Sequence, residues 1–543
     1  MRLPTFLVAL PVAYVVTAGI FLAGSGAPRA HEIAGQTPAD GFDLEEATIL
    51  ALLQDQLSGR RTARQIAELY LQHIHALDRS GPSLRSVIEL NPDALAIADA
   101  LDAERQTSGP RGPLHGIPVL IKDNIDTADH MSTTAGSLAL EGSIATQDAF
   151  IVERLRVAGA VILGKTNMSE WANFRSTHST SGWSGRGGLV LNPYALDRNP
   201  CGSSSGTAVA IAANLATIGV GTETDGSILC PSSATSLVGI KPTVGLVSRS
   251  GIIPIAHTQD TAGPMARTVQ DAAILLNVLA GIDPRDQATT SDGRTQPDYR
   301  ASLDANGLRG ARIGVARATL FGYSDVTDRI ANIAIERMKE LGAVIVDPAD
   351  IPNLGKYDAS ELEVLLYEFK ADLDKYLGAL APTAKVHSLS DVIAFNEANS
   401  VREMPYFNQE LLLQAQNKGP LTDRAYRSAL TKNFRLSRKK GIDAVMDRLD
   451  LDALVAPTGG PPWPTDLVNG DHFTGSSTTP AAVAGYPSIT VPAGYAFGLP
   501  VGISFIGRAW SEPLLLKFAY AYEQGTKHRR PPKFLATADL TAH

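Results

Sequence analysis

The chain has 543 residues and a formal net charge of −8. Hydrophobic residues make up 44% and charged residues 19%, close to the average of folded globular proteins, so a large buried core is expected. The sequence has no basic tract long enough to neutralise a phosphate backbone, which disfavours nucleic-acid binding. Its two cysteines, Cys201 and Cys230, are too few for a disulfide framework or a four-thiolate zinc site. Neither HExxH nor another close metal-ligand spacing occurs, so the sequence implies no metal and no cofactor.

The amino terminus has the pattern of a secretory signal. Arg2 precedes an uncharged, apolar stretch over residues 3–23, and small residues follow at 24–27. A positive start, an apolar middle and a small-residue exit predict a cleaved signal within residues 1–30 and export to the periplasm or the medium. The alternative is a retained membrane anchor, because the stretch is nearly long enough to span a bilayer. Contact with a membrane is expected only in that case.

The first half of the chain alternates helical and strand patterns. Apolar periodicity predicts two helices within residues 42–78, the second beginning near Thr62. Residues 116–121 are short, apolar and β-branched, which predicts a buried strand that leads into Lys122. A helix over 148–159 and a buried strand over 160–164 follow.

The second half continues the alternation. A helix of small residues is expected over 208–216 and an amphipathic helix over 328–341. Residues 357–450 are charged and helical in pattern and could cap the core. Further buried strands are expected at 313–315, 343–346, 453–456, 488–491 and 501–505. This order predicts an α/β fold with a buried sheet flanked by helices, and the absence of a linker or repeat favours one large domain.

Lys122 is unusual because it directly follows an apolar strand. Burial there would remove the ammonium from water, lower its pKa and leave a neutral amine able to act as a base. Taken alone, a lysine at a strand end is more often one whose amine reaches solvent.

Two later segments are rich in glycine and hydroxyl side chains. Residues 201–207 place three consecutive serines between glycines, which indicates a tight backbone turn near a reactive group. Residues 219–228 place Ser227 after a glycine-rich loop, where several backbone N–H groups could point at one oxyanion. This is not the GxSxG nucleophile elbow, and His257 is an isolated histidine that is expected to be structural. The two cysteines flank these segments, but we expect them to be free, small packing residues rather than thiol nucleophiles.

Together these segments resemble the amidase signature family. The similarity rests on the lysine segment 116–124, the glycine- and serine-rich segment before Gly-Thr-Glu-Thr-Asp-Gly-Ser-Ile at 221–228, and Gly-Ile-Lys-Pro-Thr at 239–243. It extends over residues 42–532. The resemblance implies one domain with a central mixed sheet flanked by helices, and a serine hydrolase that cleaves carboxylic amides.

The resemblance also implies roles for individual residues. Ser227 would be the nucleophile that becomes acylated, Ser203 would relay its proton, and Lys122 would be the ultimate base. Ser203 would follow a cis peptide bond made possible by Gly202, and Ser204 could bond Lys122. The oxyanion would be held by backbone N–H groups of Thr224, Asp225, Gly226 and Ser227.

Within the family, segments 181–188, 198–206 and 259–265 resemble the bacterial peptide amidases. Glu223 and Asp225, which depart from the wider family, are shared with that group. The expected reaction is therefore removal of the C-terminal amide of a peptide, giving the acid and ammonia. The alternatives are a broader amidase acting on aryl, alkyl or fatty amides, and the glutaminase subunit of a tRNA-dependent amidotransferase. We expect a small-molecule or peptide amide as substrate, and no obligatory protein partner.

Overall fold

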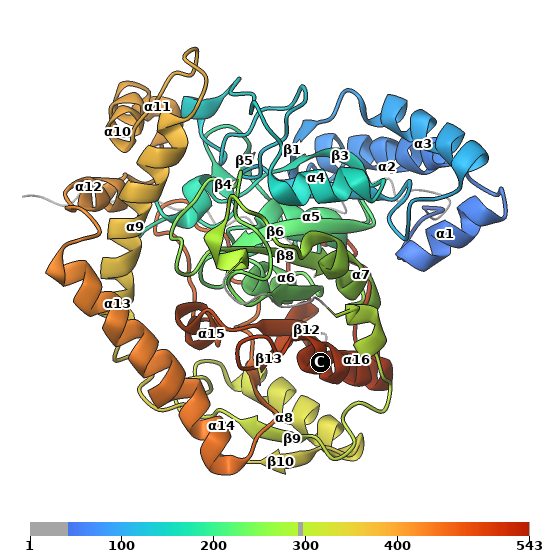
Figure 1. The fold of residues 1–543 in the computed structure, drawn as a ribbon. Helices are drawn as coiled ribbons and strands as arrows, with labels where there is room; N and C mark the ends of the chain where they lie inside the picture. Colours follow the sequence, from blue (N-terminus) through green and yellow to red (C-terminus); the bar gives the residue numbers. More distant parts are fainter. Residues whose placement is uncertain (1–41, 291–296, 542–543) are drawn as a thin grey trace, which may run out of the picture. The chain divides into compact units, whose positions relative to one another are not determined.

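The computed structural model describes residues 42–290 and 297–541. Its centre is an 11-stranded mixed sheet, as predicted (Figure 1). In spatial order the strands are β1 (Val87–Leu90), β3 (Val161–Thr166), β2 (Pro118–Lys122), β6 (Ile218–Glu223), β8 (Thr261–Ala266), β7 (Val238–Lys241), β12 (Ser488–Ala496), β13 (Leu499–Ile506), β11 (Ala453–Pro457), β9 (Arg312–Val315) and β10 (Val344–Val346). A separate hairpin pairs β4 (Trp183–Ser184) with β5 (Gly188–Leu189).

Three parallel strands position the chemically interesting residues. β2 lies between β3 and β6 and runs parallel to both. Its apolar residues are fully buried on both sides, as expected for a strand covered by other layers. Because β2 and β6 are parallel neighbours, Lys122 and Glu223 end their strands at the same edge of the sheet. Residues that follow this edge can therefore meet although they are about 100 positions apart.

Sixteen α-helices surround the sheet within the described residues. They are α1 (Ile49–Leu57), α2 (Ala63–Ile74), α3 (Ala94–Ser108), α4 (Phe150–Val157), α5 (Ser205–Ala212), α6 (Leu229–Ala234), α7 (Val269–Leu279), α8 (Asp325–Glu340), α9 (Asp358–Gly378), α10 (Leu389–Ala398), α11 (Ser400–Glu403), α12 (Glu410–Gln416), α13 (Arg424–Ser437), α14 (Asp443–Leu449), α15 (Thr479–Ala484) and α16 (Glu512–Thr526). Thr62 begins α2 with a capping box, in agreement with the predicted start. Helices α5 and α6 pack together on the sheet, while α7, α8 and α16 form a second packed group.

Two predictions about the sheet region were wrong. The predicted glycine-rich loop before Ser227 begins with strand β6, whose alternating glycines hide the usual β-branched pattern. A Cβ at Gly219 would contact Thr207 and Ile211, so the small residue is needed where α5 packs against the strand. The small-residue helix also begins at Ser205 and ends at Ala212, not at 208 and 216.

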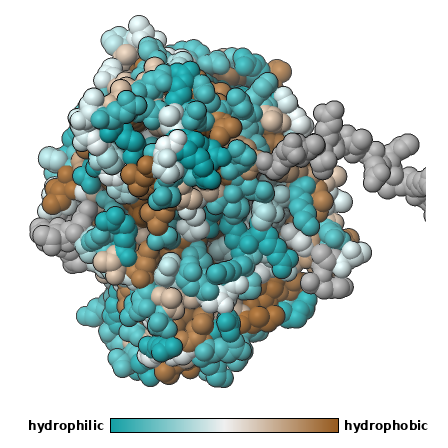
Figure 2. Space-filling model, turned by 90° about the vertical axis from the view of Figure 1, so that its right-hand side faces the viewer, coloured by the Kyte–Doolittle hydropathy of each residue, from teal (hydrophilic) through white to brown (hydrophobic). Residues whose placement is uncertain are grey.

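The segment predicted as a cap is helical, as expected. Helices α9 to α13 lie together along one side of the sheet (Figure 1). Apolar residues of α9, including Phe369 and Leu373, form a buried cluster with Trp171, Phe174 and Ile253 from the core. On the face in Figure 2, hydrophobic residues occur in small groups between hydrophilic ones, the usual mixture of a protein surface.

No helix in residues 42–290 or 297–541 is long and apolar enough to cross a membrane. The predicted secretory signal or anchor, residues 1–30, lies outside the described residues.

Candidate active site

Lys122 is completely buried at the end of β2. Its Nζ lies 2.7 Å from Ser203 Oγ, 2.9 Å from Thr222 Oγ1 and 3.2 Å from the backbone oxygen of Thr222. Burial lowers the pKa of Lys122 to about 7, partly opposed by the charges of Asp260 and Glu223. The lysine does not reach solvent, so a substantial share of it is neutral near neutral pH.

The partners of Lys122 orient its lone pair. A neutral amine has two N–H groups and one lone pair, and Thr222 offers two oxygen acceptors. The third neighbour, the Ser203 hydroxyl, can then donate to the lone pair. Asn124 Nδ2 also donates to Thr222 Oγ1 at 3.1 Å, which fixes that hydroxyl. Sequence analysis missed Thr222, because only the pairing of β2 with β6 brings it beside Lys122.

Ser203 lies in a crowded segment before α5. The peptide bond between Gly202 and Ser203 is cis, as the resemblance implied. A Cβ at Gly202 would collide with Ser169 Oγ, so glycine is required there. The expected contact between Ser204 and Lys122 was wrong: Ser204 Oγ donates to the Thr222 oxygen at 3.0 Å and accepts from the Thr222 N–H at 3.2 Å. Ser204 therefore supports the threonine that holds the lysine.

The loop after β6 presents free N–H groups. Among the described residues, no acceptor is found for the backbone N–H groups of Thr224, Asp225, Gly226 and Ser227. Glu223 accepts instead from the N–H groups of Ile228 and Leu229 at 2.7 and 2.9 Å, which closes the loop behind the four free donors.

The serine at the end of this loop is close to the Ser203 segment. Ser227 is 7% exposed, and its backbone oxygen accepts from the Ser204 N–H at 3.1 Å. The two serine-bearing segments are thus joined directly, with Ser203 on the Lys122 side. Unpaired N–H groups beside a reachable hydroxyl are what an oxyanion site requires.

The expectation of two free cysteines was wrong. Cys201 and Cys230 form a disulfide, with their Cα atoms 5.9 Å apart. Cys201 directly precedes Gly202, and Cys230 lies in the first turn of α6, three residues after Ser227. Their separation of 29 residues gave no sign of this pairing, which arises because the two segments meet at the sheet edge. The disulfide is a second covalent connection between the segments that carry Ser203 and Ser227.

Removing this disulfide is expected to lower both stability and activity. Closing a loop of this size constrains the unfolded chain by about 3 kcal/mol. The double variant Cys201→Ala/Cys230→Ala should lose about that much unfolding free energy in urea titration, and its kcat should fall as the serine segments loosen. Wild-type protein in dithiothreitol should behave in the same way, whereas the reductant should leave the double variant unchanged. Equal unfolding free energies for oxidised and reduced wild type would contradict this expectation.

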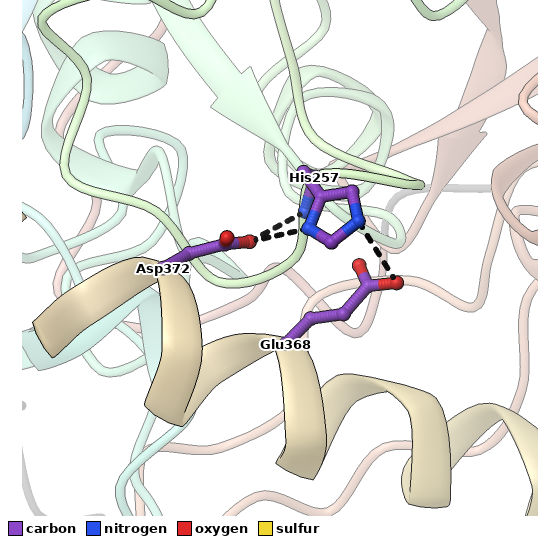
Figure 3. A group of neighbouring side chains, drawn as sticks. All are labelled: His257, Glu368 and Asp372. Carbon is purple, nitrogen blue, oxygen red and sulfur yellow. Dashed lines mark hydrogen bonds and ion pairs between the residues drawn. The ribbon is translucent and has the colours of Figure 1, made fainter. Parts of the chain in front are cut away.

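His257 forms an ion triad with α9 (Figure 3). Its Nδ1 lies 2.8 Å from Asp372 Oδ2, and its Nε2 lies 3.5 Å from Glu368 Oε1. Burial lowers the pKa of His257, but the Asp372 hydrogen bond and the Glu368 charge outweigh this, so the net shift is upward. Glu368 also accepts from Thr258 N–H and the Tyr426 hydroxyl. Because these oxygens already have protein donors, the triad attaches α9 to the core, in agreement with the expected structural role of His257.

A cavity of about 420 Å³ lies beside this triad, lined by His257 and Asp372 and also by Asn124 and Thr222. It therefore extends from α9 to the residue that holds Lys122.

Comparisons with known proteins agree with this geometry. The Amidase family profile matches residues 66–516, and the chain belongs to that family. It is 44% identical over 505 residues to a probable amidase of Arabidopsis thaliana, covering 91% of this chain and 93% of the relative. The native peptide amidase of Stenotrophomonas maltophilia has a similar structure, with 52% identity, a TM-score of 0.87, and coverage of 91% of this chain and 100% of that chain.

The family also includes relatives that work in tRNA metabolism. A glutamyl-tRNA(Gln) amidotransferase component of Chloroflexus aurantiacus is 35% identical over 504 residues, covering 91% of this chain and 99% of the relative. The fold is that of the structurally similar peptide amidase, and the chain is an amidase, a hydrolase of amide C–N bonds.

Proposed function

We propose that this amidase removes the carboxamide from the C-terminus of peptides through an acyl-enzyme on Ser227. The observation that carries the mechanism is the contact of the buried Lys122 Nζ with Ser203 Oγ, beside a loop of four free N–H groups. The observation that favours peptide amides is the likeness to a structure described as peptide amidase in complex with chymostatin, at 53% identity, a TM-score of 0.88 and 100% coverage of that chain.

Acylation begins with proton transfer from Ser227. A serine hydroxyl is a weak nucleophile and needs a nearby base. Ser203 gives its proton to neutral Lys122 and takes the proton of Ser227, since a hydroxyl both donates and accepts. Ser227 Oγ then attacks the amide carbon, and the N–H groups of residues 224–227 hold the resulting oxyanion.

The same proton returns to the leaving group. As the tetrahedral intermediate collapses, Ser203 passes a proton from Lys122 to the nitrogen, so that ammonia and not amide anion departs. Water then attacks the acyl-enzyme with the same relay as base. The products are the peptide acid and ammonia, and Ser227 is restored.

Two other functions use the same chemistry. A broader amidase would accept aryl, alkyl or fatty amides, because substrate choice depends on the approach to the site and not on the fold. A glutaminase subunit would release ammonia from glutamine within a complex, as the 35% identity to an amidotransferase component suggests. The predicted secretory segment argues against that role, and so does the Glu223/Asp225 pair.

We also propose that the chain is exported, with residues 1–30 as the signal and residues 42–532 as the amidase domain. The Cys201–Cys230 disulfide supports this, because disulfides persist in oxidising compartments.

The deciding experiment measures ammonia release from a short peptide amide by the purified mature protein. A free amino-acid amide, free glutamine and a fatty amide are run beside it, with aniline release followed from an aryl anilide. We expect the highest kcat/KM for the peptide amide, with all internal peptide bonds intact by mass spectrometry. Equal or faster turnover of another substrate would move the function to a general amidase or a glutaminase.

A further inference from the structure

Two carboxyl groups lie close together beside the nucleophile loop. Asp225 is half-buried two residues before Ser227, and Glu361 is 8% exposed in the first turn of α9. Gln259 connects them: its Nε2 donates to Glu361 Oε1 at 3.0 Å and to the oxygen of Thr224 at 3.3 Å. The α9 carboxyl is therefore held next to the residue that precedes Asp225.

These carboxyl groups are short of hydrogen-bond donors. Asp225 Oδ2 accepts from Thr479 Oγ1 at 2.6 Å, but its Oδ1 is buried without a partner. Among residues 42–290 and 297–541, neither Asp225 nor Glu361 forms an ion pair with a cationic side chain within 4 Å. The buried Lys241 influences Asp225 only at longer range and donates to the oxygen of Pro242.

A third acceptor faces the same group. Tyr357 is 1% exposed, and its hydroxyl is buried without a partner. Burial raises the pKa of Tyr357, and the charges of Glu361 and Asp225 raise it further, which places the hydroxyl near both carboxyls. Burial likewise raises the pKa of Glu361, and the charge of Asp225 adds to the shift. The structure thus places repelling carboxyls together and supplies no charge to compensate them.

We propose that Asp225, Glu361 and Tyr357 form a subsite for a positively charged group of the substrate, such as a lysine or arginine side chain near the amide. An ammonium or guanidinium group would supply the missing donors and offset the repulsion, and charge-assisted hydrogen bonds of this kind are strong. A carboxylate would be repelled. The inference rests on the proposed peptide-amide reaction and adds to it a preference for basic substrates.

The test compares N-acetylated tripeptide amides that differ at one position only. Lysine, norleucine or glutamate is placed at the residue that bears the amide and, in a second series, at the preceding residue. We expect the wild type to favour lysine over norleucine by roughly tenfold in kcat/KM in one series, with glutamate poorest. Glu361→Gln should reduce that ratio to about one. Glu363→Gln is the matched control, because Glu363 is on the same helix but pairs with Lys418 at 2.6 Å, and its ratio should stay unchanged.

A binding measurement separates this inference from the proposed function. Calorimetric titration of the Ser227→Ala variant with the lysine and norleucine amides needs no turnover. Tighter binding of the lysine amide, lost on adding Glu361→Gln, would support the subsite even if the wild type failed to hydrolyse these compounds. Equal binding of both amides, or a lysine preference that survives Glu361→Gln, would overturn it.

Discussion

Replacing Ser227 by alanine is expected to lower kcat by roughly 10⁴-fold or more, because no other nucleophile can form the acyl-enzyme. The described residues offer the Ser227 side chain no hydrogen-bond partner, so the variant should fold normally. Ammonia release should therefore disappear while the thermal unfolding midpoint stays within a degree or two of the wild type.

Ser232→Ala is the matched control for this loss. Ser232 lies on α6, five residues after Ser227, and its buried hydroxyl has no hydrogen-bond partner. Its removal should change kcat by less than about twofold. If Ser227→Ala retained substantial turnover, or if Ser232→Ala were equally damaging, Ser227 would not be the nucleophile.

Replacing Lys122 by methionine is expected to lower kcat by roughly 10³-fold or more, because Ser203 then has no base for its proton. The wild-type pH profile gives an independent readout. Since Lys122 works as a neutral amine and its pKa is about 7, kcat/KM should be low in acid, rise through pH 7 and level off above it. The rise should be missing from the residual activity of Lys122→Met.

The outcome that contradicts this role is specific. A mild effect of Lys122→Met, or a variant that keeps the rise near pH 7, would assign the titration to another group. Asp260 is the neighbour to consider, because burial raises its pKa to about 6. Asp260→Asn would then be the variant that loses the rise.

The sequence indicated Lys122, Ser203 and Ser227 well because each is part of a continuous segment with unusual composition. An apolar strand that ends in lysine and a serine run between glycines are local signals. The free N–H groups after β6 could be anticipated only through the family resemblance. The cis bond after Gly202 was likewise implied by the resemblance and not by composition.

What sequence could not show depends on contacts between distant segments. Thr222 holds Lys122 because β2 and β6 are adjacent and parallel, and no local pattern gives that order. The Cys201–Cys230 disulfide and the triad of His257 with α9 arise in the same way. Strand β6 was missed for a different reason: its glycines serve packing against α5 and weaken the strand signal.

The central claim is that hydrolysis passes through an acyl group on the enzyme, and partitioning of that group tests it most directly. The protein is given a peptide amide and, separately, the methyl ester of the same peptide, each with hydroxylamine present. A common acyl-enzyme predicts the same ratio of peptide hydroxamate to peptide acid from both substrates, because the leaving group has departed before partitioning. Ratios that differ between amide and ester, or ammonia release without any hydroxamate, would contradict the account.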